Sequence, residues 1–320
     1  ESHRDRMLIF RYAGLQNKSN INWQSNGPIA YNTAKACFKE MTVPEAVSIT
    51  SAFQETMLAA KPAGEMESCS VLQTDDAFWK VFEFDFVSGK PYDNADFDAG
   101  AAKAVISEDM ARRLFGTSEV VGKTFLLNHT AYLISGVVRS VSRLARYAYA
   151  QVWIPLSSTD AFTTAWGDEK IMGIVAVFIL AKSKEDFPAI HNEADRLKAV
   201  FMAGHPNFDL LYRGQPDTYF VAAQRYSANN PPAVKEAVRQ YILTLLVLLI
   251  VPAVNLSGLT LSRMRKRLSE IGVRKAFGAP RRELMIQVLS ENMLYSLFGG
   301  ILGLILSYIA TFLLGGMLFS

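Results

Sequence analysis

Two long uncharged segments near the C-terminus enclose a strongly basic stretch, and this arrangement limits the fold more than any other feature. The segments run from Tyr241 to Leu261 and from Asn292 to Ser320. A helix needs roughly 20 consecutive apolar residues to cross a bilayer, so both segments are long enough. The sequence therefore predicts two transmembrane helices, at about residues 238–262 and 290–316.

The basic stretch between these segments predicts their orientation. Residues 263–283 hold eight basic and two acidic side chains, a net charge of +6, whereas the whole chain carries +3. Short loops rich in Lys and Arg stay on the cytoplasmic side of a membrane. We therefore expect a cytoplasmic connector at residues 263–285 and an extracytoplasmic domain before the first helix. Because the positive charge is local, it does not indicate a nucleic-acid partner.

The beginning of the chain predicts a missing segment. Glu1 is followed by neither a signal peptide nor a hydrophobic anchor, yet a domain that precedes the first span must still be exported. We therefore expect the chain to be part of a longer protein, with one more helix before Glu1, and the end at Ser320 without a polar tail predicts truncation there too.

The residues before the helices show the pattern of an α+β domain. The sequence predicts a strand at Met7–Tyr12, a helix at Ile29–Glu40 and a second strand at Val47–Phe53. A similar unit spans residues 174–212. Short strands and turns lie between the two units, at about residues 65–168. The predicted fold is thus an α+β extracytoplasmic domain of two βαβ-like units with an inserted β-rich subdomain, followed by α-helical transmembrane segments.

The domain boundary is expected in the polar, proline-containing segment Ser227–Pro232. This gives a first domain at 1–228 and a helical domain at 229–320. Two further strands are expected at Phe82–Val87 and Thr218–Ala222, and a helix that begins after the N-cap Ser107.

Several apparent functional motifs are better explained as structure. Five residues separate Gly116 from Gly122, whereas a phosphate-binding loop needs four and must lead from a strand into a helix. Asp75 is expected in a solvated turn or as a helix cap. Cys37 and Cys69 are expected to be buried free thiols, with a disulfide as the alternative. No constellation of catalytic or metal-binding residues is present, so the sequence does not indicate an enzyme.

The strongest motif lies in the basic connector. A short helix from Glu270 to Ala276, with Gly278 as its stop, would place apolar side chains among basic ones. Such a helix favours docking into a groove of a partner, and the alternative is a loop that lies on anionic lipid headgroups. The candidate site comprises Glu270, Ile271, Gly272, Val273, Arg274, Lys275, Ala276, Phe277 and Gly278.

A stripe of small residues in the last helix predicts close helix packing. Gly299, Gly300 and Gly303 would allow another helix to approach closely. That helix could belong to the same protomer or to a second subunit.

The motifs resemble a known family of permeases. The connector, followed by Ser290-Glu291 and the glycines of the last helix, is similar to the FtsX-type permease domain. The segments Leu72–Phe82, Val105–Gly116, Val121–Phe125 and Ile134–Val138 resemble the periplasmic core domain of MacB-type permeases. The resemblance covers nearly the whole chain.

This resemblance implies a non-catalytic permease subunit of an ABC transporter. The connector would be a coupling helix through which ATP hydrolysis by a separate ATPase moves the periplasmic domain, for efflux or extraction of a hydrophobic, peptide or lipid-like substrate. This chain would bind no cofactor, since ATP and Mg would be held by the ATPase.

The resemblance also implies partners and a location. Expected partners are an ABC ATP-binding subunit, a second permease in a homodimer or a related heterodimer, a periplasmic adaptor or outer-membrane protein, and membrane lipids. The expected location is the cytoplasmic (inner) membrane of a bacterium. An alternative function is a non-transporting FtsX-like regulator or sensor of a periplasmic enzyme or a signalling kinase.

Overall fold

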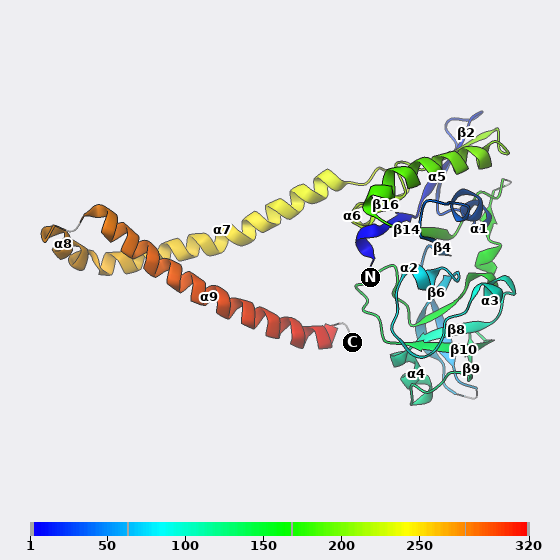
Figure 1. Cartoon of the computed structure of the whole chain (residues 1–320), viewed down its shortest axis with the longest axis horizontal. Coiled ribbons are helices and arrows are strands. Elements are labelled where there is room, and N and C mark those ends of the chain that lie inside the picture. Colours follow the sequence, from blue (N-terminus) through cyan, green and yellow to red (C-terminus); the bar gives the residue numbers. More distant parts are fainter. Residues whose placement is uncertain (1–2, 63, 168, 279, 319–320) are drawn as a thin grey trace. The chain divides into compact units, whose positions relative to one another are not determined.

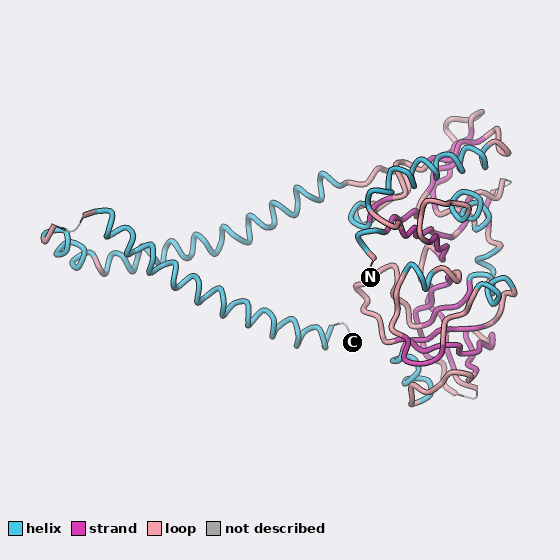
Figure 2. The backbone as a smooth tube through the Cα atoms, in the orientation of Figure 1, coloured by secondary structure: helices cyan, strands magenta, loops and turns pink. Residues whose placement is uncertain are grey.

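Two structural units make up the chain, and they divide between Ala233 and Val234. The structure is a computed structural model that describes residues 3–62, 64–167, 169–278 and 280–318. Strands and short helices form the first unit, whereas the described part of the second unit consists of long helices and a connector (Figures 1 and 2). Asp168, where the inserted subdomain is expected to end, lies outside the described residues.

An antiparallel sheet in the order β4-β14-β1-β16 lies at the centre of the first unit. Its strands are β1 (Met7–Phe10), β4 (Ala46–Ser51), β14 (Val175–Leu180) and β16 (Asp217–Thr218). All six residues of β14 are buried, with Val177 and Ile179 in one hydrophobic cluster and Ala176 and Phe178 in another. Because both faces of the sheet are covered, β1 and β14 read in the sequence as continuous apolar runs rather than alternating ones.

Different elements cover the two faces of this sheet. The first cluster also contains residues of α1 (Tyr31–Ala34), of the π-helical turn Lys35–Lys39, of α5 (Phe187–Met202) and of a small second sheet. That second sheet has the order β15-β2-β3. Its strands are β2 (Ala13–Asn17), β3 (Gln24–Gly27) and β15 (Phe208–Leu211). Short helices, α2 (Phe78–Val81) and α6 (Tyr219–Ala223), contribute to the second cluster.

The β-rich middle of the unit closes on itself. Six strands pair in the order β11-β8-β10-β9-β5-β6, and β11 pairs in turn with β6, which completes a small barrel. Its bounds are β5 (Glu55–Ala60), β6 (Glu67–Thr74), β8 (Lys103–Ser107), β9 (Thr124–Leu127), β10 (Thr130–Val138) and β11 (Val152–Pro155). Closure leaves these strands without a free edge, and a third hydrophobic cluster fills the interior. One residue pair, Thr50 with Thr74, joins the barrel to the central sheet.

The remaining short elements lie around the barrel and near the central sheet. They are β7 (Phe86–Gly89), α3 (Asn94–Asp98), α4 (Glu108–Phe115), β12 (Ala165–Trp166) and β13 (Met172–Gly173). The expected helix after Ser107 is confirmed, since the Ser107 hydroxyl accepts a hydrogen bond from the Met110 N–H. The turn from Gly116 to Gly122 then leads into β9, so the reading of this segment as a turn rather than a phosphate-binding loop is also confirmed.

Two strand predictions are wrong. Thr218–Ala222 contains only the end of β16, and the chain then turns into α6, where Tyr219 packs against Tyr147 at 5.5 Å between ring centroids. In Phe82–Val87, only the last two residues belong to a strand. Phe82 instead packs its ring against Phe78 at 4.8 Å in the core, because aromatic burial outweighs strand propensity here.

Asp75 is buried rather than solvated, which corrects one of the two readings of this residue. Its carboxylate accepts a hydrogen bond from the Phe78 N–H at 3.1 Å, so it does cap α2. It also accepts hydrogen bonds from the Ser48 hydroxyl at 2.7 Å and the Ile49 N–H at 2.9 Å. Burial raises the pKa of the Asp75 carboxyl, while the Lys39 ammonium, 2.7 Å away, opposes that shift.

The two cysteines are both free and buried, as expected. Burial raises the pKa of the Cys69 thiol to about 11, and it raises the pKa of the Cys37 thiol as well. Neither thiol is therefore reactive in the folded domain, because the thiolate is the nucleophilic form.

The second unit contains two helices that are long and apolar enough to cross a membrane. They are α7 (Val234–Lys266) and α9 (Arg281–Leu318), with α8 (Leu268–Ala276) between them. The candidate spans are Val234–Lys266 and Leu289–Leu313, with mean hydropathies of 2.4 and 2.0. None of either apolar window is buried inside the structure, which distinguishes these helices from core helices of a soluble domain.

Candidate coupling site

The connector between the two candidate spans folds as a short helix, as expected. α8 begins after Arg267 and ends at Ala276, and Phe277 is its C-cap residue. The Gly278 N–H donates a hydrogen bond to the Lys275 carbonyl at 3.1 Å. Gly278 has a φ of +91°, a conformation that side chains disfavour, so its role as the helix stop is confirmed.

The apolar residues of α8 divide between two faces. Successive helical residues lie about 100° apart, so Val273 is about 200° around the helix from Ile271. Ile271 is half-buried and lines a pocket within the second unit, whereas Val273 is 56% exposed and Phe277 is 88% exposed. The helix thus presents Val273 and Phe277 outward and packs Ile271 toward its own unit.

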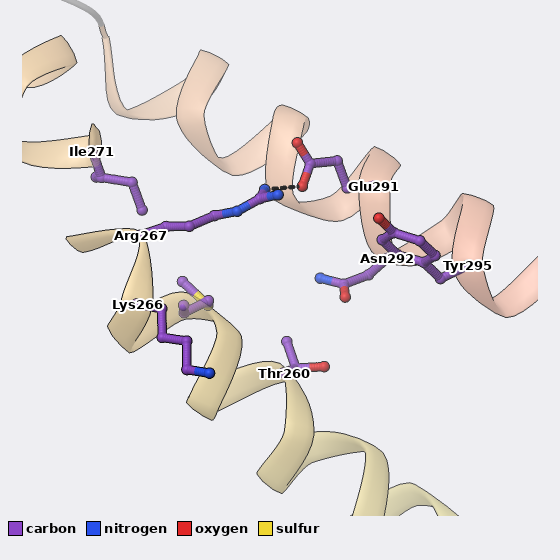
Figure 3. A pocket seen from close by; sticks show the side chains of 8 residues that line it. Thr260, Lys266, Arg267, Ile271, Glu291, Asn292 and Tyr295 are labelled. Carbon is purple, nitrogen blue, oxygen red and sulfur yellow. Dashed lines mark hydrogen bonds and ion pairs between the residues drawn. The ribbon is translucent and has the colours of Figure 1, made fainter. Parts of the chain in front are cut away.

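The pocket lies where the ends of the two long helices that adjoin the connector approach α8 (Figure 3). Its volume is about 310 Å³. It is lined by side chains from all three helices and from the residue that joins α7 to α8: Thr260, Met264, Lys266, Arg267, Ile271, Glu291, Asn292 and Tyr295.

An ion pair connects the start of α8 to the last helix. The Arg267 guanidinium donates a hydrogen bond to the Glu291 carboxylate, ten residues into α9 (Figure 3). That hydrogen bond raises the pKa of Arg267 further above its already high ordinary value. The sequence did not predict this pair; the available signal was an acidic residue, Glu291, at the start of an otherwise apolar span.

Basic side chains occupy the last turn of α8. Arg274 and Lys275 lie there, and Glu270 lies in the first turn, so both signs of charge complement the helix dipole. All three residues are exposed. The side chains of Arg263 and Arg281, which belong to the same basic stretch, lie outside the described residues.

The glycine stripe faces open space within this chain. A Cβ atom built at Gly299, Gly300 or Gly303 would meet no described atom within 4 Å. Close packing of another helix against this stripe stays a prediction.

The architecture defines a class: a membrane protein in which a mixed α/β domain outside the membrane is joined to helical spans with a basic connector. Comparison with known proteins identifies the family. The family model of the MacB-like periplasmic core domain matches residues 2–197, more than half of the chain, and that of the FtsX-like permease C-terminal domain matches 242–320. The chain belongs to the MacB/FtsX-like permeases of ABC transporters.

Similar proteins include an ABC transporter permease and two ATP-binding/permease proteins. The ABC transporter permease YknZ of Bacillus subtilis (strain 168) is 24% identical over 291 residues, which cover 91% of this chain and 68% of that protein. The macrolide export ATP-binding/permease protein MacB of Pasteurella multocida is 25% identical over 78% of this chain. The pyoverdine export ATP-binding/permease protein PvdT of Pseudomonas entomophila is 26% identical over 76% of this chain.

The chain spans only part of these relatives. The matches cover 35% of the MacB protein and 35% of PvdT. The names of both relatives include an ATP-binding function as well as a permease.

Proposed function

We propose that this chain is a non-catalytic permease subunit that couples ATP hydrolysis by a separate ABC ATP-binding subunit to movement of its own extracytoplasmic domain. ATP and Mg are held by that partner, and this chain binds no cofactor itself. The movement serves efflux or extraction of a hydrophobic, peptide or lipid-like substrate. A second permease, packed against Gly299, Gly300 and Gly303, completes the membrane part.

The exposed apolar face of α8 is the observation that carries this proposal. Phe277 is 88% exposed at the end of a basic helix, outside the candidate spans. An apolar side chain held in this position is typical of a helix that inserts into a groove of a partner protein. Val273, one turn earlier, adds to the same exposed apolar surface. Ile271 instead packs α8 toward α7 and α9.

The basic residues of α8 complement the apolar contact. Arg274 and Lys275 are placed to meet acidic groups at the rim of the partner groove, where complementary charge speeds association and selects the partner. The roles within the motif therefore differ: Val273 and Phe277 dock, Arg274 and Lys275 steer, and Ile271 and Gly278 set the position of the helix.

The test is affinity purification of the full-length protein from non-ionic detergent, with identification of what co-purifies. Phe277→Asp should remove the ATP-binding subunit from the purified complex. Leu144→Asp changes another highly exposed apolar residue, in the extracytoplasmic domain, and should retain the ATP-binding subunit. Recovery of the same amount of ATPase with Phe277→Asp would contradict the docking role of α8.

A charge-reversal variant provides an independent test. Arg274→Glu combined with Lys275→Glu should reduce the amount of ATPase recovered and its rate of ATP hydrolysis, with the larger effect at low salt because the contact is electrostatic. If a periplasmic enzyme or a kinase is recovered in place of an ATPase, the regulatory alternative replaces this proposal.

A further inference from the structure

A second cleft, unrelated to the coupling helix, lies in the first unit where the central sheet meets the barrel. Its volume is about 240 Å³. One wall is the end of β4 with the residues that follow it, from Thr50 to Gln54. Arg11 lies just after β1, and Arg146 and Tyr147 come from the long segment that joins β10 to β11. Elements from both halves of the domain therefore meet in this cleft.

The cleft is positively charged. Two arginines line it, and its described lining includes no Asp or Glu. Among the ion pairs of the described residues, neither Arg11 nor Arg146 has a carboxylate partner. The Arg11 guanidinium donates one hydrogen bond, to the Ala52 carbonyl at 3.3 Å, which leaves most of its five N–H donors for another acceptor.

Aromatic rings position both guanidinium groups. The central carbon of Arg11 lies 5.4 Å from the centroid of the Phe53 ring, and that of Arg146 lies 5.9 Å from the Tyr147 ring. Cation–π contacts of this kind favour a particular orientation of the arginine without neutralising its charge. Leu72 and Phe178 add apolar surface to the same cleft.

We propose that this cleft binds a small anionic group, a carboxylate or a phosphate, that is carried on an aromatic or apolar body. The planar guanidinium groups match such anions with paired hydrogen bonds, and the rings accept the apolar part. The volume is below the roughly 300–1,000 Å³ of typical ligand pockets, so the cleft accommodates one end of a larger molecule. This inference goes beyond the coupling role of α8 and does not depend on it.

Water-soluble probes can test the proposal on the full chain in non-ionic detergent. Saturation-transfer NMR titrations would compare indole-3-acetate with indole-3-acetamide, which differ only in the anionic group, and would add phenyl phosphate as a second anion. At least one anion should bind, whereas the neutral amide should not. The ratio of the two anion affinities then identifies whether carboxylate or phosphate is preferred.

Arginine variants locate the binding to this cleft. Arg11→Gln and Arg146→Gln should each weaken anion binding about tenfold, which corresponds to about 1.4 kcal/mol. Arg143→Gln is the matched control, because Arg143 lies on the same segment, 6.0 Å from the Tyr149 ring, but does not line the cleft. Its affinity should equal that of the unchanged protein.

Three results would overturn the proposal: no binding of either anion, equal binding of the amide, or an equal loss with Arg143→Gln. Arg11 contacts the backbone, so its variant is checked for folding by circular dichroism. Arg146 is exposed, and Arg146→Gln remains decisive if Arg11→Gln does not fold.

Discussion

Two ion pairs in this chain differ in what they contribute, because one is buried and the other faces solvent. The Asp75 side chain is 0% exposed, and Lys39 is its cationic partner. Arg267 and Glu291 are 53% and 36% exposed, so water and salt screen their attraction. The buried pair therefore matters for stability, and the exposed pair matters mainly for the position of α8.

Removal of the cation from the buried pair should strongly destabilise the extracytoplasmic domain. Lys39→Met leaves the Asp75 charge buried without compensation, which costs about 3–5 kcal/mol. It also removes the hydrogen bond from the Lys39 ammonium to the Val47 carbonyl, 2.8 Å long. Thermal unfolding followed by near-UV circular dichroism measures this loss.

Lys35→Met is the matched control for this prediction. Lys35 is exposed and belongs to the same turn, so its replacement should change stability by less than about 0.5 kcal/mol. Equal melting temperatures for the two variants would show that the Lys39–Asp75 pair does not stabilise the domain.

At the scale of elements, the Glu193 carboxylate connects α5 to the segment before β4 through hydrogen bonds. Glu193 accepts hydrogen bonds from the Thr42 N–H at 3.0 Å and the Val43 N–H at 3.1 Å. Burial of Glu193 acts to raise its pKa, but these backbone donors, the Thr42 hydroxyl and Arg196 outweigh burial and hold the pKa below the ordinary value of 4.5. This contact makes the stability of the domain depend on pH.

The sign of that dependence follows from the lowered pKa. The unfolded chain binds a proton at Glu193 more readily than the folded chain, so the contact stabilises the fold above about pH 4.5. Its contribution disappears as the pH falls through the lower pKa of the folded state. Glu193→Gln should reduce stability by about 1.5–3 kcal/mol at pH 7 and make the decline below pH 4.5 shallower.

Melting temperatures measured from pH 7 to pH 3 test this prediction. Glu40→Gln changes an exposed carboxylate near the same loop and should follow the unchanged protein. A Glu193→Gln variant whose curve runs parallel to that of the unchanged protein over the whole range would exclude the assigned role of this carboxylate.

The end of α8 gives a second prediction at this scale. Gly278→Ala forces a side chain into a backbone with φ of +91°, at a cost of about 1–2 kcal/mol. A cost of this size lowers the ratio of native to non-native connector by about 5–30-fold. Recovery of the ATP-binding subunit should fall accordingly. Gly258→Ala, a helical glycine with open space around its Cβ position, should leave recovery unchanged.

The elements predicted from the sequence are those with local signals. The connector helix follows from its own apolar spacing and from Gly278, and β1 and β14 follow from their apolar runs. Closure of the barrel could not be predicted, because β6 and β11 pair across about 80 residues and β6 begins with the polar Glu67 and Ser68. Burial of Asp75 likewise depends on its ion pair with Lys39. Only the folded structure brings the two residues together, because they lie far apart in the sequence.

For the candidate site, the sequence predicted the helix but not the faces of its residues. The roles of Ile271 and Val273 depend on where α7 and α9 lie, and that information is tertiary. The Arg267–Glu291 pair also joins two separate helices, so no local pattern contains it.

At the scale of the whole molecule, charge and hydropathy together predict which parts lie on which side of the membrane. The basic residues of the connector favour the cytoplasm, and a chain with two spans then places the first unit outside. Each side offers a highly exposed apolar residue, Leu144 at 70% and Phe277 at 88%. A cysteine at either position would be accessible to a labelling reagent from its own side.

The protein is suited to such labelling because its native thiols should not react with the reagent in the folded state. Cys37 and Cys69 are buried, and burial raises the pKa of both thiols. In spheroplasts treated with a membrane-impermeant maleimide, Leu144→Cys should therefore react at once. In cells that lack the ATP-binding subunit, so that no partner covers the connector, Phe277→Cys should react only after the membrane is permeabilised, and the unchanged protein only after denaturation. Labelling of Phe277→Cys in intact spheroplasts would place the connector outside, where it could not reach a cytoplasmic ATPase.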